Sequence, residues 1–298
     1  MEEGELVVSI RCITYNHEPY IRQCLDGFVM QKTNFCFEAI VHDDASTDGT
    51  ATIIQEYAEK YPDIIKPIFE TENKFSKHDG SLRMIMNKAC MGKYIAICEG
   101  DDFWIDPYKL QKQVDYLEKH PDCVACFHNA RVQYKDHVSL FNDLQENHHP
   151  STEDIIKRRW FIATPTLMYR NIIHDLPQWS WDVVNGDYLI ELFLAKEGEF
   201  YYMDDVMSVY RQDGLGVSAV LNKNAVVMEE RLIDLLNKMK SFYSDGYASV
   251  FDESIKNYQK MRADYVREAY YEQHPIVRLF RPKTYKRMIK KWLRASLT

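Results

Sequence analysis

Short apolar runs alternate with segments of helical spacing along the first half of the chain. Five runs rich in apolar residues, many of them β-branched, lie at 6–13, 37–41, 64–69, 94–98 and 123–127. Both faces of each run are apolar, which predicts strands buried on both sides. Segments 21–29, 53–61 and 110–117 place apolar side chains three and four residues apart, which predicts amphipathic helices. We expect Asp106 and Pro107 to form the N-cap and first turn of the third helix.

This alternation predicts an α/β fold with a mostly parallel sheet flanked by helices. Polar clusters follow three of the predicted strands, at 14–17 (TYNH), 42–44 (HDD) and 99–102 (EGDD). Open sheets of this kind bind ligands beyond the carboxyl ends of their strands. We therefore expect the three clusters to meet in one ligand site.

The second half of the chain has a looser pattern. We expect a loop at 134–150, helices at 151–160 and 186–196, one or two strands at 200–210, and charged helical structure from about residue 222. The resulting prediction is a main domain at 1–220, divided near residue 128, followed by a helical C-terminal extension at 221–298.

The charge is unevenly distributed. The chain has a formal net charge of −8, whereas residues 273–298 contain eight Lys or Arg and no acid, so the remainder carries −16. An acidic body argues against a nucleic-acid partner. The basic tail, which also contains apolar residues, has the composition of a segment that lies on an anionic membrane surface, or of a helix that packs its apolar side on the body.

No run reaches the roughly 18 apolar residues of a membrane span, and the first five residues are acidic rather than signal-like. We therefore expect a cytoplasmic protein. Seven cysteines, mostly within apolar runs, indicate reduced and buried thiols. Cys123 and Cys126 form a CxxC, but no second CxxC or His pair accompanies them, which disfavours a zinc or redox site.

The run at 97–102 (ICEGDD) ends a buried strand in crowded carboxylates, which repel one another unless something positive neutralises them. Neither GxGxxG nor the P-loop pattern occurs, so a phosphate group would have to be bound in another way. A hard divalent cation held by one or two carboxylates, with ligand phosphates completing its shell, provides one such way. The alternative is that Asp101 and Asp102 only cap a turn.

The succession VSIRCITYNH, EAIVHDDASTDGT and GKYIAICEGDDFW, followed by DPYKLQKQ, resembles the glycosyltransferase family 2 enzymes over about residues 6–215. The resemblance implies a GT-A fold that binds a nucleotide-sugar donor, with a donor-binding half at 1–128 and an acceptor half at 129–220. It also implies nucleotide-binding roles for Thr14, Tyr15, Asn16 and Asp44, the last on the base.

In the same family the DxD-like motif binds ribose and metal. The resemblance therefore implies that Asp101 contacts the ribose and that Asp102 ligates Mn²⁺ or Mg²⁺ on the diphosphate. Many members also have a Tyr-Arg-x-His stretch, which reads Tyr210-Arg211-Gln212-Asp213 here, with Asp at the position of the His. Arg211 is a candidate for phosphate binding, or for an ordinary surface ion pair.

Family 2 enzymes place their general base at the start of a helix after the acceptor region. VVNGDYLIELF resembles that segment and nominates Asp187, with Glu191 as the fallback. The alternative for Asp187 is a first-turn acid favoured by the helix dipole. The QxxRW motif of processive synthases has Ile156 in place of its Gln, which favours addition of a single sugar.

Together these features predict an inverting, metal-dependent glycosyltransferase. It would move one sugar from a nucleotide-sugar, with UDP favoured, to a surface polysaccharide or lipid-linked oligosaccharide at the inner face of the membrane. Two alternatives remain, a non-catalytic sugar-binding relative and a receiver-type phosphoacceptor domain. The receiver type would end near residue 120 and leave the second half unexplained.

Overall fold

A computed structural model describes residues 5–144, 148–159, 161–174, 176–181, 183, 185–212, 225–243 and 245–273. Trp160, Asp213 and the basic tail after Gln273, each part of a sequence-based expectation, lie outside these residues.

Residues 6–119 form five strands and four helices. They are β1 (Leu6–Thr14), α1 (Ile21–Val29), β2 (Cys36–Asp43), α2 (Thr50–Lys60), β3 (Ile65–Phe69), α3 (Ser81–Ala89), β4 (Tyr94–Ile97), β5 (Phe103–Trp104) and α4 (Lys109–Lys119), with a 3₁₀ turn at Phe75–Lys77. The following elements are β6 (Cys123–Gln133), β7 (Val138–Leu140), α5 (Thr152–Lys157), β8 (Met168–Arg170), α6 (Gly186–Glu197), β9 (Glu199–Arg211), α8 (Ala225–Phe242) and α9 (Ala248–Gln273). Further 3₁₀ turns lie at Thr164–Thr166, Gln178–Ser180 and Asp245–Tyr247.

A nine-stranded mixed sheet forms the centre of the molecule, in the order β3-β2-β1-β4-β8-β6-β9-β5, with β7 paired to β6. The first four strands in this order are parallel, so β1, β2 and β4 end at one rim. β8 runs antiparallel to both β4 and β6, β6 and β9 are parallel, and β5 is antiparallel to β9. The last pairing brings the carboxyl end of β9 beside the residues that follow β4.

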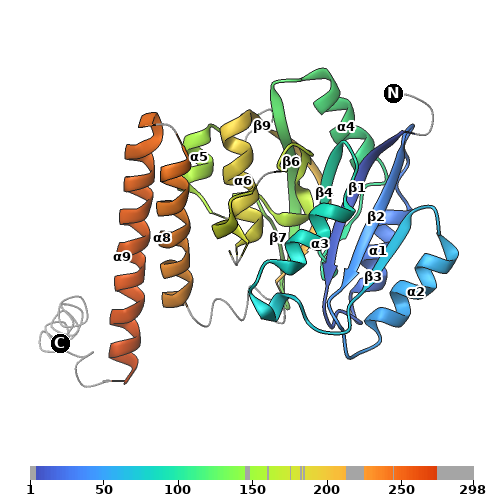
Figure 1. The fold of residues 1–298 in the computed structure, drawn as a ribbon, viewed down its shortest axis with the longest axis horizontal. Coiled ribbons are helices and arrows are strands. Elements are labelled where there is room, and N and C mark those ends of the chain that lie inside the picture. The colour runs from blue at the N-terminus through green and yellow to red at the C-terminus, as the bar shows by residue number, and fades with distance from the viewer. Residues whose placement is uncertain are drawn as a thin grey trace, which may run out of the picture.

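Helices cover the sheet on both faces (Figure 1). One hydrophobic cluster joins the sheet to α1, α2 and α4, and a second joins it to α3, α5, α6, α8 and α9. Residues 188–195 of α6 are all buried, because this helix has the sheet on one side and the C-terminal helices on the other. Figure 1 shows α8 and α9 side by side at one end of the molecule.

The expected mostly parallel α/β architecture and the predicted strands and helices of the first half are confirmed. The predicted start of α4 was wrong: the helix begins at Lys109, and Asp106 instead accepts the Tyr108 N–H through Oδ1 at 2.7 Å. The expected loop at 134–150 contains β7. Sequence analysis did not predict α3, β5 or β8.

All seven cysteines are free, and six of them are buried, which confirms the expectation of reduced thiols. Cys36, at the start of β2, is the exposed one. Among the residues that the structure describes, none of the helices has the length and apolar character needed to cross a membrane.

Candidate active site

The carboxyl end of β1 supplies the first side of the site. Thr14 is buried, and its carbonyl accepts the Asp44 N–H at 2.9 Å. The next residue, Tyr15, is 43% exposed. Asn16 has a left-handed backbone (φ 55°), and its Oδ1 accepts the Thr47 N–H at 2.7 Å. Together these bonds fix the loop after β1 against the loop after β2.

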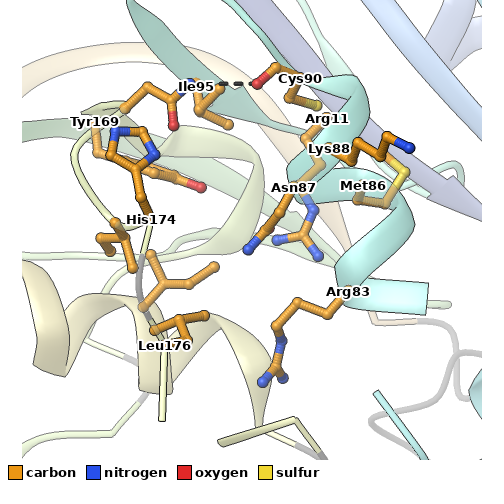
Figure 2. A pocket seen from close by; sticks show the side chains of 13 residues that line it. Arg11, Arg83, Met86, Asn87, Lys88, Cys90, Ile95, Tyr169, His174 and Leu176 are labelled. Carbon is orange, nitrogen blue, oxygen red and sulfur yellow. Dashed lines mark hydrogen bonds between the residues drawn. The ribbon is translucent and has the colours of Figure 1, made fainter. Parts of the chain in front are cut away.

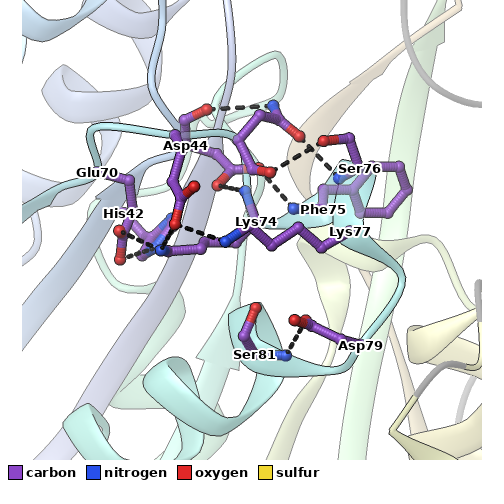
Figure 3. A network of polar contacts seen from close by, with 11 residues as sticks. His42, Asp44, Glu70, Lys74, Phe75, Ser76, Lys77, Asp79 and Ser81 are labelled. Carbon is purple, nitrogen blue, oxygen red and sulfur yellow. Dashed lines mark hydrogen bonds and ion pairs between the residues drawn. The ribbon is translucent and has the colours of Figure 1, made fainter.

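Asp44 lies at the centre of a polar network beyond the end of β2 (Figure 3). Its carboxylate accepts the N–H groups of Lys74 at 2.7 Å and Phe75 at 2.9 Å, and its carbonyl accepts Asn73 Nδ2 at 3.1 Å. The side chain is 1% exposed. Asp44 therefore holds the loop after β3 against this rim, and its contact with a base remains a prediction.

His42 is buried at the edge of the same network, with Nε2 3.4 Å from Glu70 Oε1. Burial lowers the pKa of His42, although the charges of Asp44 and Glu70 oppose that shift. No role was predicted for His42.

The acidic turn after β4, which we define as residues 99–102, contacts the end of β9. Asp102 is 2% exposed, and its Oδ1 accepts the Arg211 N–H at 2.8 Å. The Arg211 guanidinium donates to the Asp101 carbonyl and to Gln23, and lies over the rings of Phe103 (4.4 Å) and Tyr20 (5.0 Å). Arg211 therefore contacts the acidic turn through its backbone N–H and its guanidinium. Its binding to phosphate stays a prediction.

Two carboxyl groups of the acidic turn have raised pKa values. Burial raises the pKa of Asp102 well above its usual range, and the charge of Asp101 adds to the effect. Burial likewise raises the pKa of Glu99 to about 7; Arg11 opposes this shift, whereas Asp101 and Asp187 increase it. The Asp101 carboxylate lies 4.0 Å from His17 Nε2.

The acidic turn fits a hard divalent cation, because its carboxylate oxygens are crowded and a nearby positive charge would favour their ionised forms. Among the described residues this turn does not form a group of three converging metal ligands. Such a turn suits an ion that takes one or two protein ligands and completes its shell with phosphate and water.

Asp187 lies in the first turn of α6, where its Oδ1 accepts the Tyr188 N–H at 2.8 Å and its Oδ2 accepts the Thr164 hydroxyl at 3.3 Å. The charge of Asp187 also contributes to the raised pKa of Glu99. Glu191, one turn further on, is 3% exposed, and its Oε2 has no hydrogen-bond partner among the described residues. Burial raises the pKa of Glu191 well above its usual range, and Asp187 adds to the shift.

The contacts of Gln23 and Phe103 with Arg211 were not predicted, because both residues are distant from Arg211 in the sequence. Sequence analysis placed Thr164 on the acceptor side, and its hydroxyl lies 3.3 Å from Asp187 Oδ2.

Cys123 of the CxxC lies near His149 and Glu199, with one ligand atom of each within 4.8 Å of the others. Cys123 and Cys126 are both buried. Burial raises the pKa of Cys123.

Comparison with known proteins identifies the family. A profile described as glycosyl transferase family 2 matches residues 9–172. An uncharacterized protein of Mycobacterium tuberculosis (strain ATCC 25618 / H37Rv) is 40% identical over 214 residues, which cover 70% of this chain and 60% of the relative. This chain therefore spans less than two thirds of that relative.

Two solved structures share the fold. One is S. aureus TarS 1–349 in complex with UDP, with a TM-score of 0.57 and 16% identity over 88% of this chain and 92% of the other. The second is the mannosyltransferase PcManGT from Pyrobaculum calidifontis in complex with GDP-Man and Mn²⁺, with a TM-score of 0.57 and 15% identity over 95% and 83%. With the nine-stranded sheet and the family match, these similarities show that the fold is GT-A and that the chain belongs to glycosyl transferase family 2.

Proposed function

We propose that the protein is an inverting, metal-dependent glycosyltransferase that moves one sugar from a nucleotide-sugar donor to an acceptor hydroxyl. The observation that carries this proposal is the contact of Arg211, at the end of β9, with the acidic turn after β4. The charge of Asp187 contributes to the raised pKa of Glu99 in that turn. The similarity to structures with bound UDP or GDP-Man and Mn²⁺ supports a nucleotide-sugar donor.

In this proposal Thr14, Tyr15 and Asn16 flank the nucleobase, and Asp44 contacts it. Asp101 faces the ribose, while Asp102 holds Mn²⁺ or Mg²⁺. The cation would stabilise the negative charge that develops on the departing diphosphate. Arg211, already positioned by Asp101 and Asp102, adds a second positive charge on the phosphate side.

Asp187 acts as the general base. The acceptor oxygen attacks the anomeric carbon from the face opposite the diphosphate while an oxygen of Asp187 takes its proton. The bond between the anomeric carbon and the phosphate oxygen breaks, and the nucleoside diphosphate leaves with the electron pair, so the configuration is inverted. Thr164, which donates to Oδ2 at 3.3 Å, orients the carboxylate.

UDP is our favoured nucleotide, and the acceptor is a surface polysaccharide or lipid-linked oligosaccharide. The basic tail at 273–298 would hold the enzyme at the cytoplasmic face of an anionic membrane. Cosedimentation with anionic vesicles tests this location. Vesicle binding that is unchanged after deletion of residues 273–298 would contradict it.

Thermal denaturation with a panel of nucleoside diphosphates, with and without Mn²⁺, tests the donor site. A ligand that binds only the folded protein raises its stability by RT ln(1 + [L]/Kd). We expect the largest rise with UDP plus Mn²⁺, and little rise with either alone. The Asp102→Asn variant should lose the Mn²⁺-dependent part, whereas Asp63→Asn, a change of an exposed acid, should keep it.

No stabilisation by any nucleoside diphosphate with metal would reject the proposal. Binding of a donor that is never consumed with any acceptor would favour the non-catalytic alternative. The receiver-type alternative has no support in the family match, which extends to residue 172.

A further inference from the structure

A cavity of about 230 Å³ lies on the sheet face covered by α3 and α6 (Figure 2). Its strand residues are Arg11 of β1, Ile95 of β4 and Tyr169 of β8. Ile95 pairs with Tyr169 in the sheet, and Arg11 precedes the end of β1 by three residues. The cavity is therefore lined by the middle of the sheet, and its Arg11 also lies near Glu99 of the acidic turn, whose raised pKa it opposes.

Arg11 is the unusual residue of this cavity. It is 9% exposed, and its neighbours across the sheet are Ile40 and Ile97, both members of the hydrophobic cluster. Its Nε has no hydrogen-bond partner among the described residues. The carboxyl group of Glu99 interacts electrostatically with this guanidinium. The Nε donor is still without a hydrogen-bond partner, and a buried N–H in that state costs free energy.

Tyr169 provides a second donor beside Arg11. Burial raises the pKa of Tyr169 to about 12, and the nearby Arg11 guanidinium opposes that shift. Its hydroxyl therefore keeps its proton at neutral pH and can donate a hydrogen bond into the cavity.

The remaining wall is apolar inside and polar at the mouth. Met86, Ile95 and Ile190 are buried around the cavity, while Lys88 and His174 are exposed at its edge. Arg83, also in the wall, donates to the carbonyls of Ser180 and Val183. No carboxylate occurs among the lining residues that the structure describes.

We propose that this cavity binds a small organic anion, whose phosphate or carboxylate group is held by Arg11 and Tyr169 and whose short apolar part contacts Met86, Ile95 and Ile190. The volume equals that of roughly eight water molecules in the liquid, which accommodates an acidic group with a short carbon chain. A free metabolite and the head group of a lipid both have this chemistry.

Thermal denaturation in EDTA, without nucleotide, tests the cavity independently of the metal-dependent donor site. Butyl phosphate represents a free anion, and phosphatidylcholine vesicles containing phosphatidic acid represent a lipid. We expect butyl phosphate to stabilise the wild type, Asp102→Asn and Arg131→Met, the last being a change of an exposed arginine. In Arg11→Met we expect the affinity to fall on the order of tenfold to a hundredfold, because a charged hydrogen bond is lost.

Ile190→Phe, which narrows the cavity and keeps Arg11, should also weaken the binding of butyl phosphate. This second variant still tests the proposal if Arg11→Met does not fold. Stabilisation by butyl phosphate that both changes remove identifies a free anion as the ligand. Vesicle binding that needs Arg11, without a response to butyl phosphate, identifies a lipid head group. No response to either probe, or a response that both variants retain, overturns the proposal.

Discussion

At the scale of single residues, two acids one turn apart on α6 have different surroundings. Asp187 is partly exposed and accepts hydrogen bonds through both oxygens, whereas Glu191 is buried and has one oxygen without a partner. A carboxylate that takes the proton of an acceptor hydroxyl must be accessible to it. This condition favours Asp187 over the buried Glu191 as the base.

We expect Asp187→Asn to lower the turnover rate by about 10²- to 10⁴-fold, the range typical of a lost general base. The affinity for nucleoside diphosphate and Mn²⁺ should stay near that of the wild type, because Asp187 is not proposed to bind the donor. Steady-state kinetics and calorimetry measure the two quantities. Near-normal transfer by this variant would move the role of base to another residue.

Glu191→Gln is the matched change on the same helix, and it should keep activity. It also has a defined pH dependence. Because the pKa of Glu191 is raised in the folded protein, the unfolded chain loses this proton at lower pH than the folded one, so wild-type stability falls as pH rises above about 4.5. Glutamine cannot titrate, so the variant should gain stability relative to wild type between pH 5 and pH 8. Urea unfolding at pH 5 and pH 8 measures the difference in stability between the variant and the wild type. The same difference at both pH values would contradict this prediction.

Sequence analysis could predict the position of a residue that directly follows a predicted strand, but not its contacts with residues far away in the sequence. Thr14, Asp44, Asp101 and Asp102 follow apolar runs directly, so their place at the sheet rim was predictable. The bonds from Lys74 and Phe75 to Asp44 were not, because they come from a loop about 30 residues away. The contact of Arg211 with the acidic turn depends on the pairing of β5 with β9, which no local pattern encodes.

At the scale of elements, the close approach of α1 to β5 positions the acidic turn. A Cβ at Gly27 would lie 2.9 Å from the backbone N and 3.1 Å from the backbone O of Trp104. β5 begins at Phe103, directly after Asp102, so any displacement of this strand moves the Asp102 carboxylate, our proposed metal ligand.

Gly27→Ala should therefore destabilise the protein by about 1–3 kcal/mol, as overpacking does. In an uncrowded helix the same change would stabilise it by roughly 1 kcal/mol. Urea denaturation gives the sign, and Mn²⁺-dependent UDP binding reports the acidic turn. Gln55→Ala, at an exposed position of α2, is the control. If Gly27→Ala were more stable than the wild type, α1 and β5 could move apart without a cost in free energy, which would contradict this prediction.

The lengths of the elements and the residues that they bury explain which elements sequence analysis did not predict. β5 and β8 contain two and three residues, too few for a periodic pattern. α3 buries Arg83 together with Met86, so the sequence shows no apolar face that would predict this helix. α6 was found because its apolar residues have helical spacing, although its burial on all sides required the C-terminal helices.

At the scale of the whole molecule, α8 and α9 share one hydrophobic core with the sheet, α5 and α6. The Tyr243 hydroxyl donates to the Leu192 carbonyl of α6, and Ser254 donates to Ile156 of α5 at 3.3 Å. Arg159 and Glu229 form an ion pair at 2.9 Å with side-chain exposures of 13% and 1%. The division into 1–220 and 221–298 remains a prediction, but this packing favours cooperative unfolding.

Glu229→Ala leaves Arg159 in the core without that carboxylate and should cost about 3–5 kcal/mol. Glu230→Ala breaks the adjacent exposed pair with Arg262 and should cost at most about 1 kcal/mol. Calorimetry should show a single transition for both variants, at a lower temperature in the first. Two separated transitions would indicate that the C-terminal helices unfold independently.

The distribution of the cysteines leaves one accessible position for chemical labelling. Cys36 is the exposed thiol, and burial is the leading cause of the raised pKa of five others, Cys24, Cys90, Cys98, Cys123 and Cys126, while Cys12 is fully buried. Maleimide reagents attack accessible thiolates, so a fluorophore should attach at one defined position without mutagenesis. Because β2 runs from Cys36 to Asp43, the dye would sit at the opposite end of the strand from the donor site and leave it unobstructed.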